Sequence, residues 1–295
     1  MNQVLSIVKL LRPQQWLKNG FVFLPIFFHG SLWNGKILFY SFITFIAFCF
    51  IASSIYCLND IQDIEIDRIH PEKRNRPLPS GKVSIKLAYS LIPLLVIGSL
   101  LITLFLPHLR TLQVSLVLII YFILNIGYCL KLKKYSIIDV FIVSFGFVLR
   151  IIAGGLATDI WLSPWIILMT FLLALFMAFA KRRDDVVKYH RENIITRKKT
   201  LHYNLDYLNL VLGIIGAITI VCYILYTVSP EVMERYPGKY VYITTIFVLA
   251  GILRYLQVTV VDEKSGSPTK ILIKDRFIQL CILSWLFVFL VIIYF

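Results

Sequence analysis

The chain has 295 residues, of which 59% are hydrophobic and only 16% are charged, and its mean hydropathy is +0.80. A soluble domain cannot cover its surface with so few charged side chains, so this composition excludes an ordinary soluble protein and indicates that lipid is its main solvent. The net charge of +14 needs a separate explanation.

Apolar segments long enough to cross about 30 Å of hydrocarbon recur along the whole chain. The stretch 1–19 mixes apolar with basic residues, which predicts an interfacial helix. About nine spans are then predicted, at residues 20–37, 39–58, 87–106, 112–130, 137–158, 162–180, 205–228, 239–257 and 276–295. His29 and Asn34 interrupt the first of them. The pattern predicts an all-α, polytopic membrane bundle that forms a single domain over residues 1–295.

Lysine and arginine are concentrated in alternate loops, as the positive-inside rule requires if the N-terminus is cytoplasmic. Those stretches hold 25 of the 30 basic residues. Topology therefore explains the charge, and we expect no nucleic-acid partner. We expect a plasma (inner) membrane protein with an aspartate-rich loop at 59–86 and a basic loop at 181–204, both cytoplasmic. The five cysteines show no metal-like spacing, and the oligomeric state stays open.

The second predicted span ends in an aspartate-rich stretch. At 100° per residue, Asn59, Asp63 and Asp67 fall on one helical stripe, and Asp60 lies beside it. Carboxylates crowded this closely repel one another, so they stay ionised only if a cation neutralises them. An oxygen-only set of ligands suits Mg²⁺, which commonly bridges to phosphates. The stripe therefore predicts a magnesium site.

A basic run follows the acids and complements them. Lys73, Arg74 and Arg76 could hold the phosphate charge that the metal leaves over, and arginine offers a bidentate fork for this purpose. The alternative is a solvated acidic helix end followed by an ordinary basic loop. The ordered succession of acidic stripe, basic run and Arg-Pro-Leu-Pro turn favours a site for Mg²⁺ and a diphosphate.

These residues resemble the UbiA-type superfamily of intramembrane prenyltransferases. Asn59, Asp60, Asp63 and Asp67 match its NDxxDxxxD motif, and the stretch 74–81 supplies the RNRPLPSG tail. The resemblance implies a nine-helix bundle around a central cavity. It also implies that Asp60, Asp63 and Asp67 are catalytic residues and that these three, together with Asn59, hold Mg²⁺.

Three further stretches look closest to the branch that transfers phosphoribose to a polyprenyl phosphate. They are residues 12–19, 128–139 and 146–155. Prenyl-transferring members carry a second aspartate cluster after the sixth span, where this chain places Lys181 and Arg182 in front of its acids. Such a basic stretch suits a lipid phosphate, so these two residues are the candidate lipid-phosphate ligands.

Five other residues are candidate ligands of the donor's phosphates, each with a structural alternative. Arg150 lies within a span and either binds phosphate or forms an internal ion pair. Asp139 either contacts the metal site or pairs with Lys133. Lys133 itself is either a phosphate ligand or a positive-inside charge. Lys18 and Tyr128 are either ligands or interfacial anchors.

The expected reaction is therefore the Mg²⁺-dependent transfer of 5-phosphoribosyl from phosphoribosyl pyrophosphate to a polyprenyl phosphate. The lipid phosphate is already an anionic nucleophile, so no general base is required. One rival is a prenyltransferase that joins a prenyl diphosphate to an aromatic acceptor, with Asp184 and Asp185 as its second acidic pair. A transporter with an intramembrane ion site is a rival of another class, and it would place its acids near the middle of the membrane.

Overall fold

The computed structural model describes residues 3–69, 71, 73–192, 203–262, 271 and 274–295, and within these ranges it contains helices and no strands. Eight of the described helical segments are long and apolar enough to cross a membrane. These findings confirm the all-α, polytopic fold class. The contacts divide the chain into two compact units, Met1–Leu162 and Ser163–Phe295, and the single domain stays a prediction.

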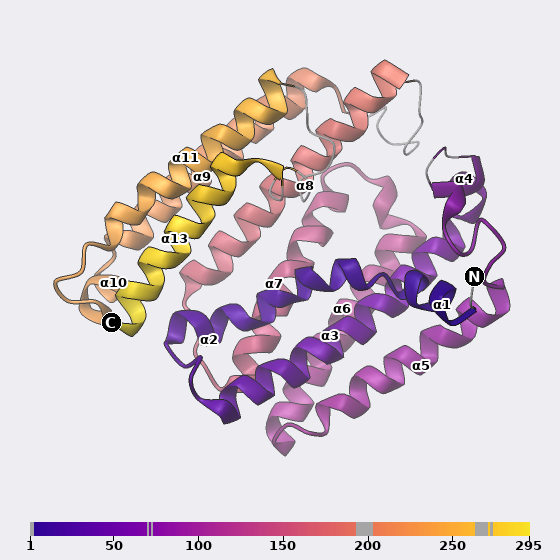
Figure 1. Ribbon diagram of the computed structural model, residues 1–295, viewed down its shortest axis with the longest axis horizontal. Coiled ribbons are helices and arrows are strands. Elements are labelled where there is room, and N and C mark those ends of the chain that lie inside the picture. The colour runs from indigo at the N-terminus through magenta and orange to yellow at the C-terminus, as the bar shows by residue number, and fades with distance from the viewer. Residues whose placement is uncertain (1–2, 70, 72, 193–202, 263–270, 272–273) are drawn as a thin grey trace. The chain divides into compact units, whose positions relative to one another are not determined.

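Unit 1 (Met1–Leu162) carries the N-terminal segment and four of the long helices (Figure 1). Its elements are α1 (Gln3–Leu11), η1 (Pro13–Phe23), α2 (Leu24–His29), α3 (Gly35–Gln62), α4 (Ile64–Ile69), η2 (Lys73–Asn75), α5 (Ile85–Thr103), α6 (His108–Leu130), η3 (Leu132–Lys134) and α7 (Ile138–Thr158). Helix α3 packs against α5, α6 and α7, and η1 packs against both α3 and α7.

The first predicted span, 20–37, is not among the eight candidates. The chain there forms the 3-10 helix η1 and the six-residue helix α2, which ends at Gly30 with φ 81°. A 3-10 run of this length is uncommon, because its hydrogen bonds have poor geometry. It is stabilised by packing, as Asn19 and Val22 are buried against unit 1. The expectation of about nine spans therefore reduces to eight among the described residues.

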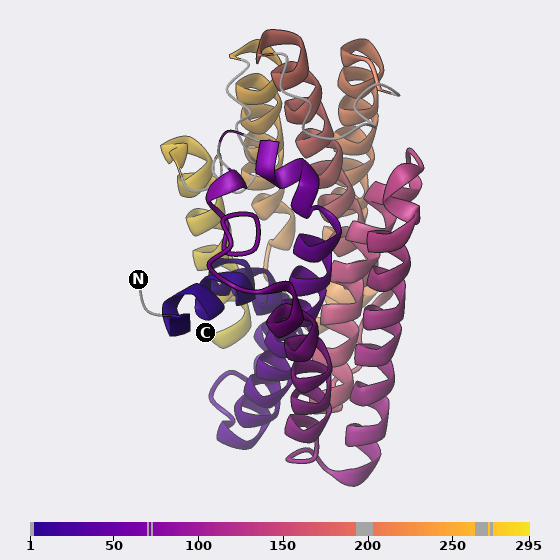
Figure 2. The ribbon, with the colours of Figure 1, turned by 90° about the vertical axis from the view of Figure 1, so that its right-hand side faces the viewer.

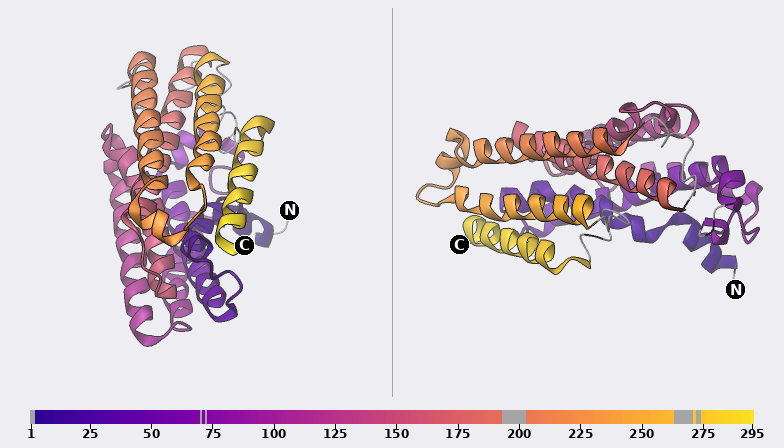
Figure 3. Two further views of the ribbon diagram at one scale, coloured as in Figure 1. Left: turned by 90° about the vertical axis from the view of Figure 1, so that its left-hand side faces the viewer. Right: turned by 90° about the horizontal axis from the view of Figure 1, so that it is seen from above.

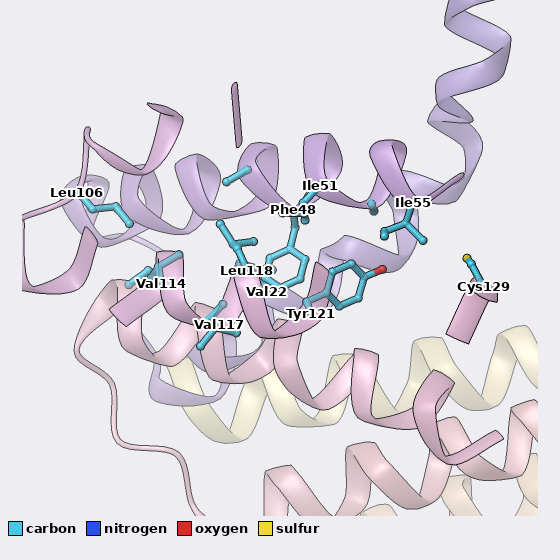
Figure 4. Packing of buried hydrophobic residues seen from close by; sticks show 14 residues of the cluster. Val22, Phe48, Ile51, Ile55, Leu106, Val114, Val117, Leu118, Tyr121 and Cys129 are labelled. Carbon is cyan, nitrogen blue, oxygen red and sulfur yellow. The ribbon is translucent and has the colours of Figure 1, made fainter. Parts of the chain in front are cut away.

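A close approach between η1 and α7 fixes their contact. A Cβ atom added at Gly154 would overlap the carbonyl oxygen of Val22. Val22 belongs to a buried cluster with Phe48, Leu118 and Tyr121, whose side chains converge in Figure 4. Glycine at position 154 thus lets η1 lie directly on the helix, which holds the N-terminal segment against the core of unit 1.

Substitution at this contact should destabilise the protein. We expect Gly154→Ala to lower the free energy of unfolding by about 1–3 kcal/mol, the usual cost of overpacking. Gly213→Ala in α9 (Leu205–Thr227) is the matched control, because its added Cβ would meet nothing within 4 Å. Thermal unfolding in detergent measures both variants. Equal melting temperatures for the two variants would contradict the close approach.

Unit 2 (Ser163–Phe295) contains the other four long segments, shown in Figure 3. Its elements are α8 (Pro164–Glu192), α9, α10 (Pro230–Arg235), η5 (Val241–Thr244), α11 (Thr245–Leu256), the π-helix η6 (Gln257–Val261) and α13 (Arg276–Tyr294). Helix α9 packs against α8 and α11, and α11 packs against α13.

The basic loop expected at 181–204 is helical over its first part, because α8 continues to Glu192. Ion pairs one turn apart support this extension: Arg182 pairs with Asp185 at 2.7 Å and Asp184 with Lys188 at 3.0 Å. Residues 193–202 of the expected loop lie outside the described residues. The predicted loop is thus wrong for Lys181 and Arg182, the candidate lipid-phosphate ligands, because both lie in α8.

Candidate active site

The acidic stripe lies where α3 passes into α4 (Figure 2). Helix α3 ends at Gln62, Asp63 caps it with φ −97° and ψ 6°, and α4 begins at Ile64. The backbone remains close to helical, because the Asp63 amide donates to the Asn59 carbonyl at 3.0 Å and the Asp67 amide donates to the Asp63 carbonyl at 2.8 Å. The acids therefore keep the stripe that their spacing predicts. They also lie at the end of the span, which argues against a mid-membrane ion site.

The N-terminal segment lies antiparallel to α3, with Arg12 beside the acids and the residues after it progressively further from them. Three side-chain contacts fix the register: Arg12 with Asp60, the Trp16 indole with the Ser53 hydroxyl at 3.0 Å, and the Asn19 amide with the Cys49 sulfur at 3.2 Å. Arg12 adopts a left-handed backbone conformation with φ 54°, which is costly for a residue with a side chain. The ion pair with Asp60 is one of the contacts that hold it there.

Asp60 and Asp67 form the buried part of the acidic group. Each residue is only 1% exposed, and one arginine nitrogen joins them: Nη1 of Arg76 lies 2.6 Å from Asp67 and 3.4 Å from Asp60. Arg12 contacts Asp60 and the Lys73 ammonium lies 3.8 Å from Asp67. Two carboxylates that lie almost out of water are thus neutralised by three basic side chains of the same unit.

Asp63 forms a second, more exposed part of the group. Its Oδ2 accepts a hydrogen bond from the Asn59 amide at 3.0 Å, and its Oδ1 accepts one from the Lys133 ammonium at 2.6 Å. Lys133 therefore pairs with Asp63. The sequence had left open a pair between Lys133 and Asp139, and the described contacts of Lys133 do not include it. Glu65 points away, as the helical periodicity predicts, and pairs with Arg68 at the surface.

The set of ligands suits Mg²⁺, although each acid currently contacts basic side chains. Within the described residues, no three His, Cys, Asp or Glu side chains are arranged as a ready metal site. However, Asp60 and Asp67 share one arginine nitrogen, so a cation already occupies the space between them. A hard cation with oxygen ligands could take that position, provided that the arginine moves to another anion.

Arg150 of α7 is 4% exposed, and the described residues that bond its side chain all do so through neutral groups. Its Nε donates to Asn19 at 2.8 Å, its Nη1 to the Gly146 carbonyl at 2.6 Å, and its Nη2 to the Tyr121 hydroxyl at 3.1 Å. Among the described residues, no carboxylate forms an ion pair with it. The internal ion pair that the sequence left open as an alternative is therefore not formed within the described part of the chain.

Lys18 lies beside Asn19 on η1 and is partly buried. Burial, and after it the positive charges of Arg150 and Arg12, together lower the pKa of its ammonium group from 10.5 to about 8. The charged groups that act on Lys18 within the described residues are thus both cations. An anion bound beside this lysine would relieve the repulsion.

This pKa predicts a pH effect on stability. Because the pKa of Lys18 lies lower in the folded protein than in the unfolded chain, the folded state binds fewer protons between pH 8 and 10.5. The free energy of unfolding should then rise with pH across this range. Thermal unfolding of the wild type and of Lys18→Met isolates the effect, since the variant should lack this contribution. If the wild type and Lys18→Met showed the same dependence of thermal unfolding on pH, the lowered pKa of Lys18 would be contradicted.

The remaining candidate residues of unit 1 differ in their surroundings. Tyr128 is partly buried and packs against the apolar cluster of unit 1. Asp139 is 2% exposed in the first turn of α7, two positions after Ile137, whose φ of 68° is strained for a β-branched residue. Arg74 is exposed, and none of the described residues bonds to its side chain.

Two of the basic residues at the start of the stretch 181–192, Arg182 and Arg183, are buried and already bonded within unit 2. Lys181 is exposed, whereas Arg182 is buried and pairs with Asp185 at 2.7 Å. Arg183 is 2% exposed and donates to Asn209 at 2.6 Å and to the carbonyl of Thr259 in the π-helix at 2.5 Å. Arg183 therefore ties α8 to α9 and η6, which is a structural role.

Sequence reasoning missed Arg12, Asn19 and Tyr121 as members of the site. All three reach it through contacts between residues 29 to 131 positions apart in the chain, and helical periodicity contains no information about such pairs. The available signals were the basic residue directly before Pro13 and the resemblance of the stretch 12–19, which contains both Arg12 and Asn19. Their significance becomes visible only once the antiparallel register with α3 is known.

The fold and this site define a multi-pass membrane protein with a magnesium-compatible acidic group at the end of a span. The chain belongs to the UbiA prenyltransferase family, whose model matches residues 22–280. The expected family is thereby confirmed, and the protein is a membrane-embedded transferase.

Two curated relatives are similar over nearly the whole chain. Both are named decaprenyl-phosphate phosphoribosyltransferase. The protein of Mycolicibacterium smegmatis is 35% identical, over 97% of this chain and 91% of that protein. The protein of Corynebacterium glutamicum is 32% identical, over 98% of this chain and 87% of that protein.

A solved structure shares the fold. The UbiA homologue of Archaeoglobus fulgidus, bound to DMAPP and Mg²⁺, superposes with a TM-score of 0.71 at 16% identity, over 98% of this chain and 99% of that one. At this identity the likeness concerns the fold.

Proposed function

We propose that the protein transfers 5-phosphoribosyl from phosphoribosyl pyrophosphate to a polyprenyl phosphate, with Mg²⁺ as cofactor and release of pyrophosphate. The names of the two relatives support this reaction, because both denote phosphoribosyl transfer to a prenyl phosphate. The Mg²⁺ in the Archaeoglobus structure supports the cofactor. The observation that carries the proposal is the pair of buried carboxylates, Asp60 and Asp67, joined by Arg76.

In this proposal Asp60, Asp63 and Asp67 hold the metal, with the amide oxygen of Asn59 as a further ligand. Bound Mg²⁺ would act as a Lewis acid that stabilises the negative charge of the departing pyrophosphate.

The basic side chains that now contact the acids are placed to bind the diphosphate oxygens. Arg76, Lys73 and Lys133 each lie within 4 Å of an aspartate oxygen, so a short movement transfers them from carboxylate to phosphate. Arg74, which is exposed on the same segment, would join them from the solvent side. Tyr128 and Asp139 are proposed as polar ligands of the donor.

The reaction exchanges one bond at the anomeric carbon of the ribose. The bond from this carbon to the diphosphate oxygen breaks, and pyrophosphate leaves with the electron pair. An oxygen of the lipid phosphate forms the new bond and needs no deprotonation, because it is already anionic. The site then contributes positioning and electrostatic stabilisation.

The lipid phosphate is assigned to Lys181 and Arg182 of α8. Lys181 is exposed, and Arg182 would have to exchange Asp185 for phosphate. We place the protein in the plasma (inner) membrane with its N-terminus and the acidic site facing the cytoplasm, where phosphoribosyl pyrophosphate is a soluble substrate. The distribution of basic residues supports this orientation.

The alternative function is prenyl transfer from a prenyl diphosphate to a small acceptor, which the family's name favours. Two assays on the purified protein distinguish the functions. One contains labelled phosphoribosyl pyrophosphate and a polyprenyl phosphate, and the other contains a prenyl diphosphate and an aromatic acid, both with Mg²⁺. We expect labelled lipid from the first assay. Product from the second assay alone would overturn the proposal.

A further inference from the structure

Two exposed lysines at the start of α5 have no acidic partner among the described residues. Lys82 lies just before the helix, and Lys86 is its second residue. By contrast, Lys73 and Lys133 each pair with an aspartate of the acidic group. Lys82 and Lys86 are therefore surface charges for which the described part of the chain supplies no counter-charge.

Beyond these lysines, the outward face of α5 is apolar. Leu94, Ile97 and Leu101 are each more than half exposed and recur at helical spacing, so they form an apolar stripe along the face that begins at Lys86. Tyr89, which is also more than half exposed, lies between the lysine and the stripe. Of the eight candidate spans, α5 has the smallest buried share, 17%. It packs against α3 at the edge of unit 1 (Figure 1).

A compact turn connects the two lysines to the acidic group. Its first residue is Arg76, whose side chain bonds both buried aspartates. The Ser80 amide donates to the Arg76 carbonyl at 3.0 Å, and the Val83 amide donates to the Pro77 carbonyl at 3.1 Å. Lys82 thus follows Arg76 by six positions within a turn that backbone hydrogen bonds close.

Apolar packing joins this turn to the first part of α5. Leu78 and Val83 of the turn are buried, and they share one cluster with Ile61 of α3 and Ala88 of α5. The turn and the start of α5 are therefore packed as one piece. A ligand that restrained the start of α5 would also restrain the position of Arg76.

The charge and polarity of this face suit an anionic phospholipid. The two ammonium groups complement an anionic headgroup, and the apolar stripe complements the acyl chains. Tyr89 lies at the change from one to the other, which is typical of tyrosines at a membrane interface. A zwitterionic lipid would bring its own cation to the lysines, and a soluble anion would leave the stripe uncovered.

We propose that unit 1 binds an anionic phospholipid at the start of α5, with the lipid phosphate on Lys82 and Lys86 and the acyl chains along the apolar stripe. The bound lipid holds the turn that presents Arg76 to the acidic group, so that turnover depends on anionic lipid. The lipid is not consumed and is distinct from the acceptor. The binding surface stands without the proposed function, whereas the effect on turnover rests on it.

Native mass spectrometry of the delipidated protein, titrated with phosphatidylglycerol or with phosphatidylcholine, tests the surface. Each lysine near an anionic lipid contributes about fivefold to affinity. We therefore expect the double variant Lys82→Gln and Lys86→Gln to bind phosphatidylglycerol about 30-fold more weakly. Its phosphatidylcholine binding should stay within about twofold of the wild type. Replacing both lysines by arginine should retain the affinity for phosphatidylglycerol, because both charges are kept.

Turnover in vesicles tests the link to Arg76. The assay with labelled phosphoribosyl pyrophosphate is run in vesicles of phosphatidylcholine alone and in vesicles that also contain phosphatidylglycerol. We expect phosphatidylglycerol to raise turnover of the wild type by about fivefold or more, as for ordinary coupling between two sites. The double variant should respond by less than about twofold.

Lys36→Gln is the matched control for the single variant Lys86→Gln. Each lysine is exposed and is the second residue of a spanning helix, α3 or α5. Lys36 precedes Asp60 by 24 positions, which correspond to about 36 Å of helix. Lys36→Gln should therefore respond to phosphatidylglycerol as the wild type does, whereas Lys86→Gln should lose part of the response.

The two measurements separate failure of the surface from failure of the proposed function. Equal phosphatidylglycerol binding by the wild type and the double variant would overturn the surface. Preferential displacement of phosphatidylglycerol by geranyl phosphate would overturn it too, because the site would then belong to a prenyl phosphate. Lysine-dependent binding with equal turnover in both kinds of vesicle would refute the link to Arg76. Lysine-dependent binding without turnover in any vesicle would refute the proposed reaction and leave the surface standing.

Discussion

Replacing Asp63 by asparagine should lower turnover by about 10²- to 10³-fold, the usual cost of losing one group that stabilises charge in the transition state. The amide has nearly the same shape as the carboxylate but carries no charge for the metal. The Asp63 side chain is 25% exposed, compared with 2% for those of Asp60 and Asp67, so this acid can be neutralised with the least disturbance of folding. Initial rates measure the loss of turnover, and size-exclusion profiles in detergent show whether the variant is still folded.

Glu65→Gln is the control for this variant. Glu65 is two positions away, has a side chain that is 78% exposed and pairs with Arg68. Its replacement should leave turnover within about twofold of the wild type, as for most surface substitutions. Near-normal activity of Asp63→Asn would remove Asp63 from the site.

Arg76→Gln should destabilise the protein as well as inactivate it. The substitution removes the guanidinium that bonds both buried aspartates, and breaking a buried ion pair by removing one partner costs about 3–5 kcal/mol. Because the Arg76 side chain is 30% exposed, we expect the lower end, about 3 kcal/mol. Turnover should fall too, since the same guanidinium is proposed to bind the diphosphate. Thermal unfolding in detergent measures the loss of stability.

Arg74→Gln is the matched control for stability. Arg74 lies two positions before Arg76, is exposed, and has no bonded partner among the described residues. Its replacement should change the free energy of unfolding by no more than about 0.5 kcal/mol. If Arg76→Gln proved as stable as Arg74→Gln, the bridge between the two aspartates would not exist in solution.

The sequence predicts the spans well where hydrophobic length alone decides them. The span expected at 205–228 is helix α9, Leu205–Thr227, and that expected at 137–158 is α7, Ile138–Thr158. It fails at 20–37, where tertiary contact decides the structure. There the chain lies on α7 at Gly154 and turns at Gly30, and neither contact follows from composition. It also fails at 181–192, because charged residues one turn apart extend α8 beyond its apolar part.

In the candidate site, too, the sequence predicts the contacts within one helix but not those between residues distant in the chain. The contact between Asn59 and Asp63 follows from the helical period, and so does the outward direction of Glu65. Which cation meets which acid does not follow, since Lys133 and Asp63 are 70 positions apart. The neutral surroundings of Arg150 were equally beyond prediction, because they come from three separate helical segments.

The most direct measurement is an experimental structure of the protein soaked with Mg²⁺ and phosphoribosyl pyrophosphate. It should show an ion between the oxygens of Asp60, Asp63 and Asp67, with Arg76 and Lys133 moved from these carboxylates onto the diphosphate. Acids that kept their present partners, Arg12, Arg76 and Lys133, with neither metal nor pyrophosphate between them, would contradict the account.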